Sequence, residues 1–186
     1  MLPVADAPSM QVSSRHHLRS DAISALQASI AADLSGSHDV VIVRRGLDVF
    51  DRVVLGIARD TYKTPLFSLE ERAEMARDAF SGSSGVVVET FSGLLVDYVE
   101  RCGASVILRG LRANSDFEYE FQMALMNRRL KRNIHTMFMM TDYKWLFTSS
   151  SIIKQTAEAG GDVQGLVPDL VWQRLKKRYG IINNGY

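Results

Sequence analysis

The sequence has only one cysteine, Cys102, which excludes a disulfide bond within the chain. This cysteine lies among apolar residues just before Gly103, a place that favours a small buried side chain in a reducing compartment. We therefore expect no catalytic role for its thiol.

The chain also lacks a surplus of either charge, because 22 Lys and Arg residues face 21 Asp and Glu residues. A net charge of +1 gives no global reason to expect a nucleic acid or an anionic membrane as a partner. No apolar run approaches the roughly 20 residues that span a bilayer. The residues after Arg15 and Arg19 form no apolar stretch of the secretory kind either. These absences predict a cytoplasmic protein.

Local features of nucleic-acid and metal sites are weak as well. The basic run at residues 127–132 lies near the end of a predicted helix, where cations are favoured in any protein, and no aromatic residue interrupts it to stack on bases. His135 has no second ligand nearby in the sequence. We therefore expect no nucleic-acid partner and no metal held by protein ligands.

What is present is the pattern of a globular α/β domain. The hydrophobic content of 46% is close to the average for globular chains. Apolar runs predict strands at residues 53–58, 86–88, 105–108 and 136–140. The stretches around them predict helices at about 41–50, 94–101 and 116–132, the last capped by Asp116. Further helices are predicted to begin at about 69, after a capping box at Ser68 and Glu71, and at 149. The last predicted helix begins near residue 168 and ends before Gly180.

Strands of continuous apolar residues, separated by helices, are typical of a parallel sheet covered on both faces. The fold class is therefore predicted as doubly wound α/β, with ligands bound at the carboxyl ends of the strands. Residues 1–37 are atypical and could be disordered, and residues 38–186 are predicted to form a single domain. Residues 21–33 could form a helix on propensity. Because this part of the chain has no clean strand pattern, the first strand of the sheet is in doubt, and residues 40–43 could replace it only poorly.

Two segments at the predicted binding edge suit phosphates. Arg109, Gly110, Leu111 and Arg112 directly follow a predicted strand, and the planar arginine fork is suited to phosphate oxygens. The alternative is a surface turn with two solvated arginines. Ser149, Ser150 and Ser151 open a helix, whose free N–H groups and positive dipole end favour anions. Ordinary capping is the alternative, but it needs only one serine.

Two further side chains are candidates with simpler alternatives. Lys63, in the loop after the strand at 53–58, could bind a phosphate or be an ordinary surface lysine. Glu120 could accept hydrogen bonds from a ribose or an adenine amine, or could simply match the dipole at a helix start.

The order and spacing of these motifs resemble the bacterial phosphopantetheine adenylyltransferase family. The resemblance runs from about Arg44 to Leu175. It rests on residues 63–72 (Lys-Thr-Pro-Leu-Phe-Ser-Leu-Glu-Glu-Arg), 109–112, 116–120 (Asp-Phe-Glu-Tyr-Glu), 126–128 and 145–151.

This resemblance implies a Rossmann-like nucleotidyltransferase that moves AMP from ATP to 4'-phosphopantetheine, with Mg²⁺ as cofactor and a homohexamer as assembly. The implied ATP-binding residues are Gly110, Leu111, Arg112, Glu120, Trp145, Leu146, Phe147, Thr148, Ser149, Ser150 and Ser151. The implied phosphopantetheine-binding residues are Lys63, Leu95 and Arg109. Lys63 and Arg112 would also stabilise charge during transfer of the adenylyl group.

The N-terminal segment departs from that family. The family's Gly-Thr-Phe-Asp-Pro and Thr-x-Gly-His runs are missing, and His38 is the nearest match to the family's catalytic histidine. One hypothesis is an out-of-frame segment, because codons for residues 17–20 (His-Leu-Arg-Ser) can spell Thr-Phe-Asp-Pro when read one base later. An insertion would also be needed, and chance is the alternative. A remnant that binds nucleotide or coenzyme A without turnover and a sister nucleotidyltransferase with another acceptor stay open as alternatives.

Overall fold

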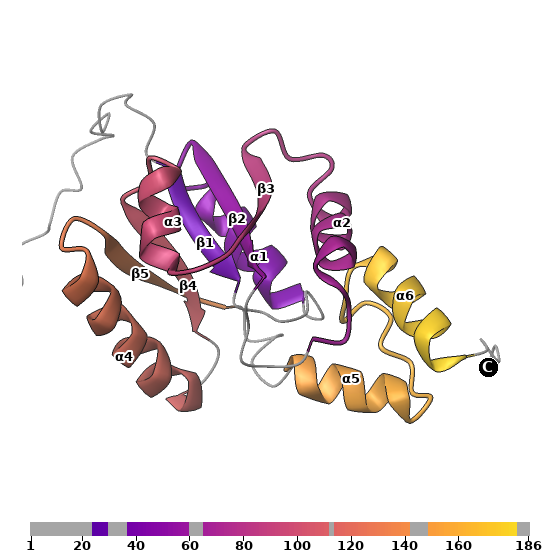
Figure 1. Cartoon of the computed structure of the whole chain (residues 1–186). Coiled ribbons are helices and arrows are strands. Elements are labelled where there is room, and N and C mark those ends of the chain that lie inside the picture. The colour runs from indigo at the N-terminus through magenta and orange to yellow at the C-terminus, as the bar shows by residue number, and fades with distance from the viewer. Residues whose placement is uncertain (1–23, 30–36, 60–64, 112–113, 142–148, 182–186) are drawn as a thin grey trace, which may run out of the picture.

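The computed structural model describes residues 24–29, 37–59, 65–111, 114–141 and 149–181. Within these ranges, five parallel strands form one sheet in the order β3-β2-β1-β4-β5, flanked by helices (Figure 1). The strands are β1 (Ser24–Ser29), β2 (Arg52–Ala58), β3 (Val86–Phe91), β4 (Val106–Leu111) and β5 (His135–Met140). The helices are α1 (Ser37–Gly46), α2 (Leu69–Ala79), α3 (Leu95–Arg101), α4 (Asn114–Leu130), α5 (Ser150–Glu158) and α6 (Asp169–Tyr179). The predicted doubly wound α/β class is confirmed.

The central strand β1 comes from residues 1–37, the segment that the sequence pattern predicted to be atypical. The predicted helix at residues 21–33 is wrong for residues 24–29, which pair with β2 from Ser24 opposite Arg52 to Ser29 opposite Ile57. The other edge of β1 pairs with β4 at Ala25 and Leu26. Hydrogen bonding to two neighbours overrides the helix propensity of this alanine-containing stretch.

Helix α1 begins at Ser37, four residues earlier than predicted. Its residues Ile42 and Val43 are fully buried, and the Val43 side chain belongs to the core cluster that also contains Leu55 and Leu108. The apolar residues 40–43 are therefore helical and do not replace the first strand.

Strand β2 is buried on both of its faces, which explains its continuous apolar run. Along β2, Val53, Leu55 and Ile57 pack in one core cluster with residues of α1, α2, α5 and α6, whereas Val54 and Ala58 pack in a second cluster with residues of α3. This alternation follows from the two-residue period of a strand.

Two boundaries differ from the sequence prediction in ways that bear on the site. Strand β4 continues to Leu111, which pairs with Met140, so Arg109 and Gly110 lie within the strand and not in a loop after it. Helix α4 begins at Asn114, so Asp116 lies in its first turn and is not its cap, because only two residues separate strand and helix. None of the helices in the described ranges combines the length and apolar character needed to cross a membrane.

Candidate functional site

Some of the candidate residues lie at the carboxyl end of a strand, where the fold class predicts ligand binding. Arg109, Gly110 and Leu111 form the last half of β4, and Leu95 is the first residue of α3. His38 lies in the first turn of α1, which follows β1 in the chain. Ser149 precedes α5. Lys63, Arg112, Trp145, Leu146, Phe147 and Thr148 lie outside the described residues.

The most distinctive contact at this edge joins two predicted site residues. The Arg109 Nε atom donates a hydrogen bond to Glu120 Oε2 at 2.7 Å, and Nη2 donates a second, short one to Oε1. Only 16% of the Arg109 side chain and 11% of the Glu120 side chain are exposed. A planar, two-bond pairing of this kind fixes the guanidinium in one orientation.

The charge state of Arg109 is set by its surroundings. Burial by itself would lower the pKa of Arg109, but the hydrogen bonds and charge of Glu120 more than offset this effect, and the pKa is raised. The charges of Asp39, next to His38, and of Tyr119 act in the same direction. The first turn of α1 is therefore close enough to Arg109 to contribute to the electrostatics of this site.

A small pocket adjoins this ion pair. It is partly open to solvent. Its lining residues come from α3, β4, α4 and β5: Leu95, Arg109, Glu120, Met123, Ala124, Asn127 and Thr136. The structure thus places Leu95 and Arg109 at one pocket, the two described residues for which the family resemblance implies contact with the acceptor substrate. Asn127 and Thr136 were missed, because neither belongs to a phosphate-binding pattern.

The serines at α5 divide into one cap and two residues of the first turn. Ser149 Oγ accepts a hydrogen bond from the backbone N–H of Ile152 at 3.2 Å, the ordinary capping contact. Ser150 and Ser151 begin the helix itself, next to its positive dipole end. Capping therefore explains Ser149, and the other two serines remain candidates for an anion site.

Two arginines bind backbone carbonyl groups at the end of β2 and shortly before α2. Arg72, only 2% exposed, donates from Nη1 to the carbonyl of Ala58 at the end of β2. Arg178 of α6 donates to the carbonyl of Leu66 and lies 5.9 Å from the centre of the Phe67 ring. These contacts join residues 14 and 112 positions apart, so no local sequence pattern indicates them.

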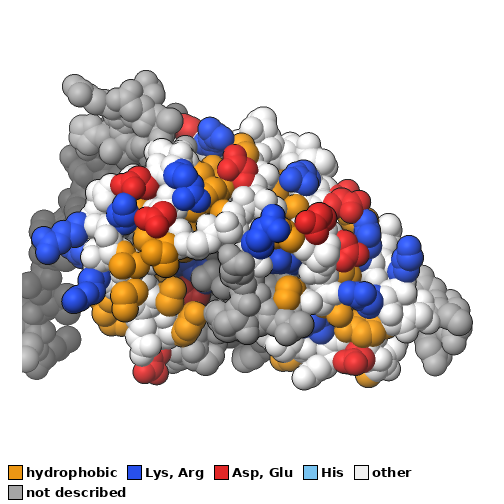
Figure 2. All heavy atoms as spheres, in the orientation of Figure 1, with side chains coloured by type: hydrophobic (Ala, Val, Ile, Leu, Met, Phe, Trp, Pro, Cys, Tyr) orange, Lys and Arg blue, Asp and Glu red, His pale blue; other side chains and the backbone are white. Residues whose placement is uncertain are grey.

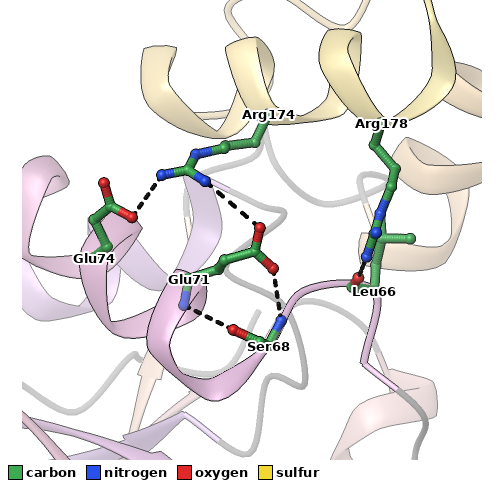
Figure 3. A network of polar contacts seen from close by, with 6 residues as sticks. All are labelled: Leu66, Ser68, Glu71, Glu74, Arg174 and Arg178. Atoms are coloured by element: carbon green, nitrogen blue, oxygen red, sulfur yellow. Dashed lines mark hydrogen bonds and ion pairs between the residues drawn. The ribbon is translucent and has the colours of Figure 1, made fainter.

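A polar network continues from Leu66 onto α2 (Figure 3). The predicted capping box is confirmed, with Glu71 N–H donating to Ser68 Oγ and Ser68 N–H donating to Glu71 Oε2. Arg174 of α6 lies over the same helix, 3.5 Å from a Glu71 oxygen and 2.6 Å from a Glu74 oxygen. The start of α2 is thus tied to the C-terminal helix.

Comparisons with known proteins find a matching family model and several similar relatives. The family model described as cytidylyltransferase-like matches residues 40–156. The phosphopantetheine adenylyltransferase of Nitratidesulfovibrio vulgaris (strain DP4) is 63% identical over 141 residues, which are 76% of each chain. That of Oleidesulfovibrio alaskensis is 61% identical over 139 residues, covering 75% of this chain and 82% of the relative. That of Syntrophus aciditrophicus is 52% identical over 144 residues, covering 77% and 87%.

Proposed function

Because this chain belongs to the phosphopantetheine adenylyltransferase family, we propose that it transfers the adenylyl group of ATP to 4'-phosphopantetheine, giving dephospho-coenzyme A and pyrophosphate. The observation that carries the proposal is the Arg109 pocket, which combines a fixed guanidinium with apolar and amide-bearing walls. A terminal phosphate would meet the arginine. The chain of a pantetheine arm, with its amides and methylenes, would suit Leu95, Met123 and Asn127.

The reaction is an in-line displacement at phosphorus. An oxygen of the acceptor phosphate forms a bond to the α-phosphorus of ATP, the bond from that phosphorus to the oxygen bridging to the β-phosphate breaks, and pyrophosphate leaves. Such chemistry needs alignment and charge stabilisation more than covalent participation by the protein. Arg109 would hold the acceptor phosphate, and Ser150 and Ser151 at the α5 terminus would face phosphates of the nucleotide. Lys63, Arg112 and His38 keep the roles that the family resemblance implies.

Mg²⁺ is proposed to enter with ATP. Within the described ranges, no three Asp, Glu, His or Cys side chains gather to hold a metal ion. Mg²⁺ usually keeps several waters and binds chiefly to substrate phosphates, so it would be carried by the triphosphate. When bound, the ion would neutralise part of the triphosphate charge.

A pyrophosphate-release assay with ATP and 4'-phosphopantetheine tests the proposal. We expect turnover by the whole chain and at least a tenfold loss of kcat/KM in Arg109→Lys, because lysine keeps the charge but lacks the fork. Arg101→Lys is the matched control, since Arg101 is an exposed arginine of α3 that lies beside the Tyr98 ring. ATP binding by calorimetry without any release would contradict turnover and favour the remnant without catalysis that the missing N-terminal runs suggest.

We also propose that the protein is a homo-oligomer, with a hexamer as the assembly that the family resemblance implies. The outer face of α4 and the edge strand β5 expose large apolar side chains, which gather over α4 in Figure 2. These exposed residues are Phe117, Phe121, Leu125, Met126, Leu130, Met137 and Met140. Extended apolar patches of this kind are uncommon on monomers, and a second copy of the chain would cover this one.

A further inference from the structure

Leu95 forms part of the wall of the Arg109 pocket, and its position depends on where α3 begins. It is the first residue of that helix and lines the pocket together with Met123 and Ala124 of α4. The residue before it, Leu94, makes no side-chain capping hydrogen bond, although such a cap commonly fixes the start of a helix. The start of α3 must therefore be fixed by other contacts.

Tyr98, in the first turn of α3, connects this helix to the sheet. Only 5% of Tyr98 is exposed, and its ring stacks on that of Phe91 with centroids 4.6 Å apart and an angle of 3° between the planes. Its hydroxyl donates to Glu89 Oε2 at 2.7 Å. Its backbone N–H donates to the Leu94 carbonyl at 3.2 Å, which closes the first turn. One residue thus links the start of α3 to two side chains of β3.

Gly56 of β2 leaves the room that the Tyr98 ring occupies. It pairs with Glu89, and Phe91 lies two residues further along β3 on the same face. A Cβ atom at position 56 would lie 3.0 Å from Cε1 of Tyr98 and 3.2 Å from Cε1 of Phe91. Both distances are shorter than the ordinary carbon contact of about 3.5–4.0 Å. Gly56, Glu89 and Phe91 therefore form a fitted seat for the tyrosine, which we call the tyrosine seat.

A second connection of α3 leads to α4. Lys131, just after α4, donates from Nζ to Glu100 Oε2 at 2.7 Å and lies 3.6 Å from Asp97 Oδ1. About half of each carboxylate side chain is exposed, so water screens these ion pairs and they hold the helix weakly. The buried, closely packed tyrosine seat is therefore the stronger anchor of α3.

We propose that Tyr98 is a positioning residue for the acceptor substrate, which fixes the start of α3 on the tyrosine seat and thereby sets the place of Leu95 in the Arg109 pocket. This inference rests on the proposed function, in which Leu95 contacts the pantetheine arm. The effect is confined to the acceptor, because the proposed nucleotide-binding residues lie on elements other than α3.

Calorimetric titration of the full chain with 4'-phosphopantetheine, and separately with α,β-methylene-ATP, tests the proposal. For Tyr98→Leu, which removes the ring but stays apolar, we expect 4'-phosphopantetheine affinity to fall about fivefold or more, because a displaced wall contacts the substrate poorly. Affinity for the nucleotide analogue should stay within about twofold. Tyr98→Phe keeps the ring and should retain 4'-phosphopantetheine affinity within about twofold.

Val171→Ala is the control for a general loss of stability. Val171 of α6 is fully buried in the core cluster on the other face of the sheet, so its truncation leaves a cavity far from the tyrosine seat. Both affinities should stay unchanged in this variant.

A double-mutant cycle with Leu95→Ala shows whether Tyr98 acts through Leu95. If it does, Tyr98→Leu should weaken 4'-phosphopantetheine binding by less than about twofold once Leu95 is already truncated. Gly56→Ala presses on the ring from the sheet and carries the same test if Tyr98→Leu fails a thermal-unfolding check. It should weaken binding of the acceptor about twofold or more, and only when Leu95 is present.

Three results would overturn the proposal: equal loss of affinity for both ligands in Tyr98→Leu, full additivity of Tyr98→Leu with Leu95→Ala, or unchanged 4'-phosphopantetheine affinity in both Tyr98→Leu and Gly56→Ala. The first would make Tyr98 an ordinary core residue. A folded, unmodified protein that binds no 4'-phosphopantetheine would refute the proposed acceptor and this role of Tyr98 together. Binding without pyrophosphate release would contradict turnover alone.

Discussion

Tyr98 is a buried residue of α3 whose hydroxyl group has a charged partner. Its side chain is 5% exposed, its ring stacks on Phe91 with centroids 4.6 Å apart, and its hydroxyl donates to Glu89 Oε2 at 2.7 Å. Burial, followed by the hydrogen bond to Glu89, raises the pKa of Tyr98 above its ordinary value of about 10. The folded protein therefore resists ionisation of this phenol.

This raised pKa predicts a specific loss of stability at alkaline pH. Above about pH 10 the unfolded chain loses the phenolic proton while the folded chain keeps it, so the stabilisation present below pH 10 decreases as the pH rises. Tyr98→Phe should cost about 1 kcal/mol near neutral pH through the lost hydrogen bond, and it should lose less stability than the unmodified protein at pH 11. Urea unfolding at pH 8 and pH 11 measures the difference, with Tyr179→Phe as control. If Tyr98→Phe and the unmodified protein differ in their free energy of unfolding by the same amount at both pH values, the raised pKa of Tyr98 is contradicted.

At the same scale, sequence reasoning identified Arg109 and Glu120 but not their contact. The pattern placed Arg109 in a loop, whereas the extra pairing of β4 with β5 places it inside a strand that faces α4. A contact between side chains of two elements can be predicted only when the register of the strand and the start of the helix are both known. Asn127 was missed for a related reason, since a single amide on a helix resembles any other surface residue until the pocket is formed.

Among the elements, the predictions of helices and strands succeeded where the sequence carries a clear hydrophobic pattern or a clear capping signal. The apolar run of β2 and the capping box of α2 are examples, because both signals are local in the sequence. Strand β1 was missed because its residues, Ser-Ala-Leu-Gln-Ala-Ser, carry no apolar run and have good helix formers. Its conformation is fixed by pairing with β2 and β4, which lie far away in the sequence.

Helix α6 is predicted to stabilise the start of α2 through two contacts of different salt dependence. Arg174→Ala removes partly exposed ion pairs to Glu71 and Glu74 and should cost about 0–1 kcal/mol, a loss that disappears in 1 M NaCl. Arg178→Ala removes a hydrogen bond to the Leu66 carbonyl and a contact with the Phe67 ring, and should cost about 1 kcal/mol in either salt condition.

Thermal unfolding at low and high salt distinguishes the two effects, and Lys177→Ala, an exposed change on the same helix, is the control. Equal salt sensitivity of the two arginine variants would show that the Leu66 contact is no stronger than a surface ion pair.

For the whole molecule, the apolar face of α4 predicts assembly. Phe121 is 46% exposed, and its ring lies 5.7 Å from that of Phe117, so Phe121→Glu places a charge in the middle of the proposed interface. We expect light scattering coupled to size exclusion to show a smaller species for this variant than for the unmodified protein. Ile152→Glu changes an equally exposed residue on α5 and should leave the mass unchanged. An unmodified protein that runs as a monomer would contradict the proposed assembly.

The position of β1 in the sheet has a consequence for synthesis of the chain. The ribosome delivers β1 before either of its neighbours, and the second neighbour starts only at residue 106 of 186. Until then a nascent chain can pair β1 on one edge at most, so the sheet closes late and through contacts distant in sequence. If translation stalls before β4 has left the ribosome, the nascent chain would therefore expose the unpaired edge of β1. An exposed strand edge of this kind promotes aggregation, and chaperones shield such surfaces.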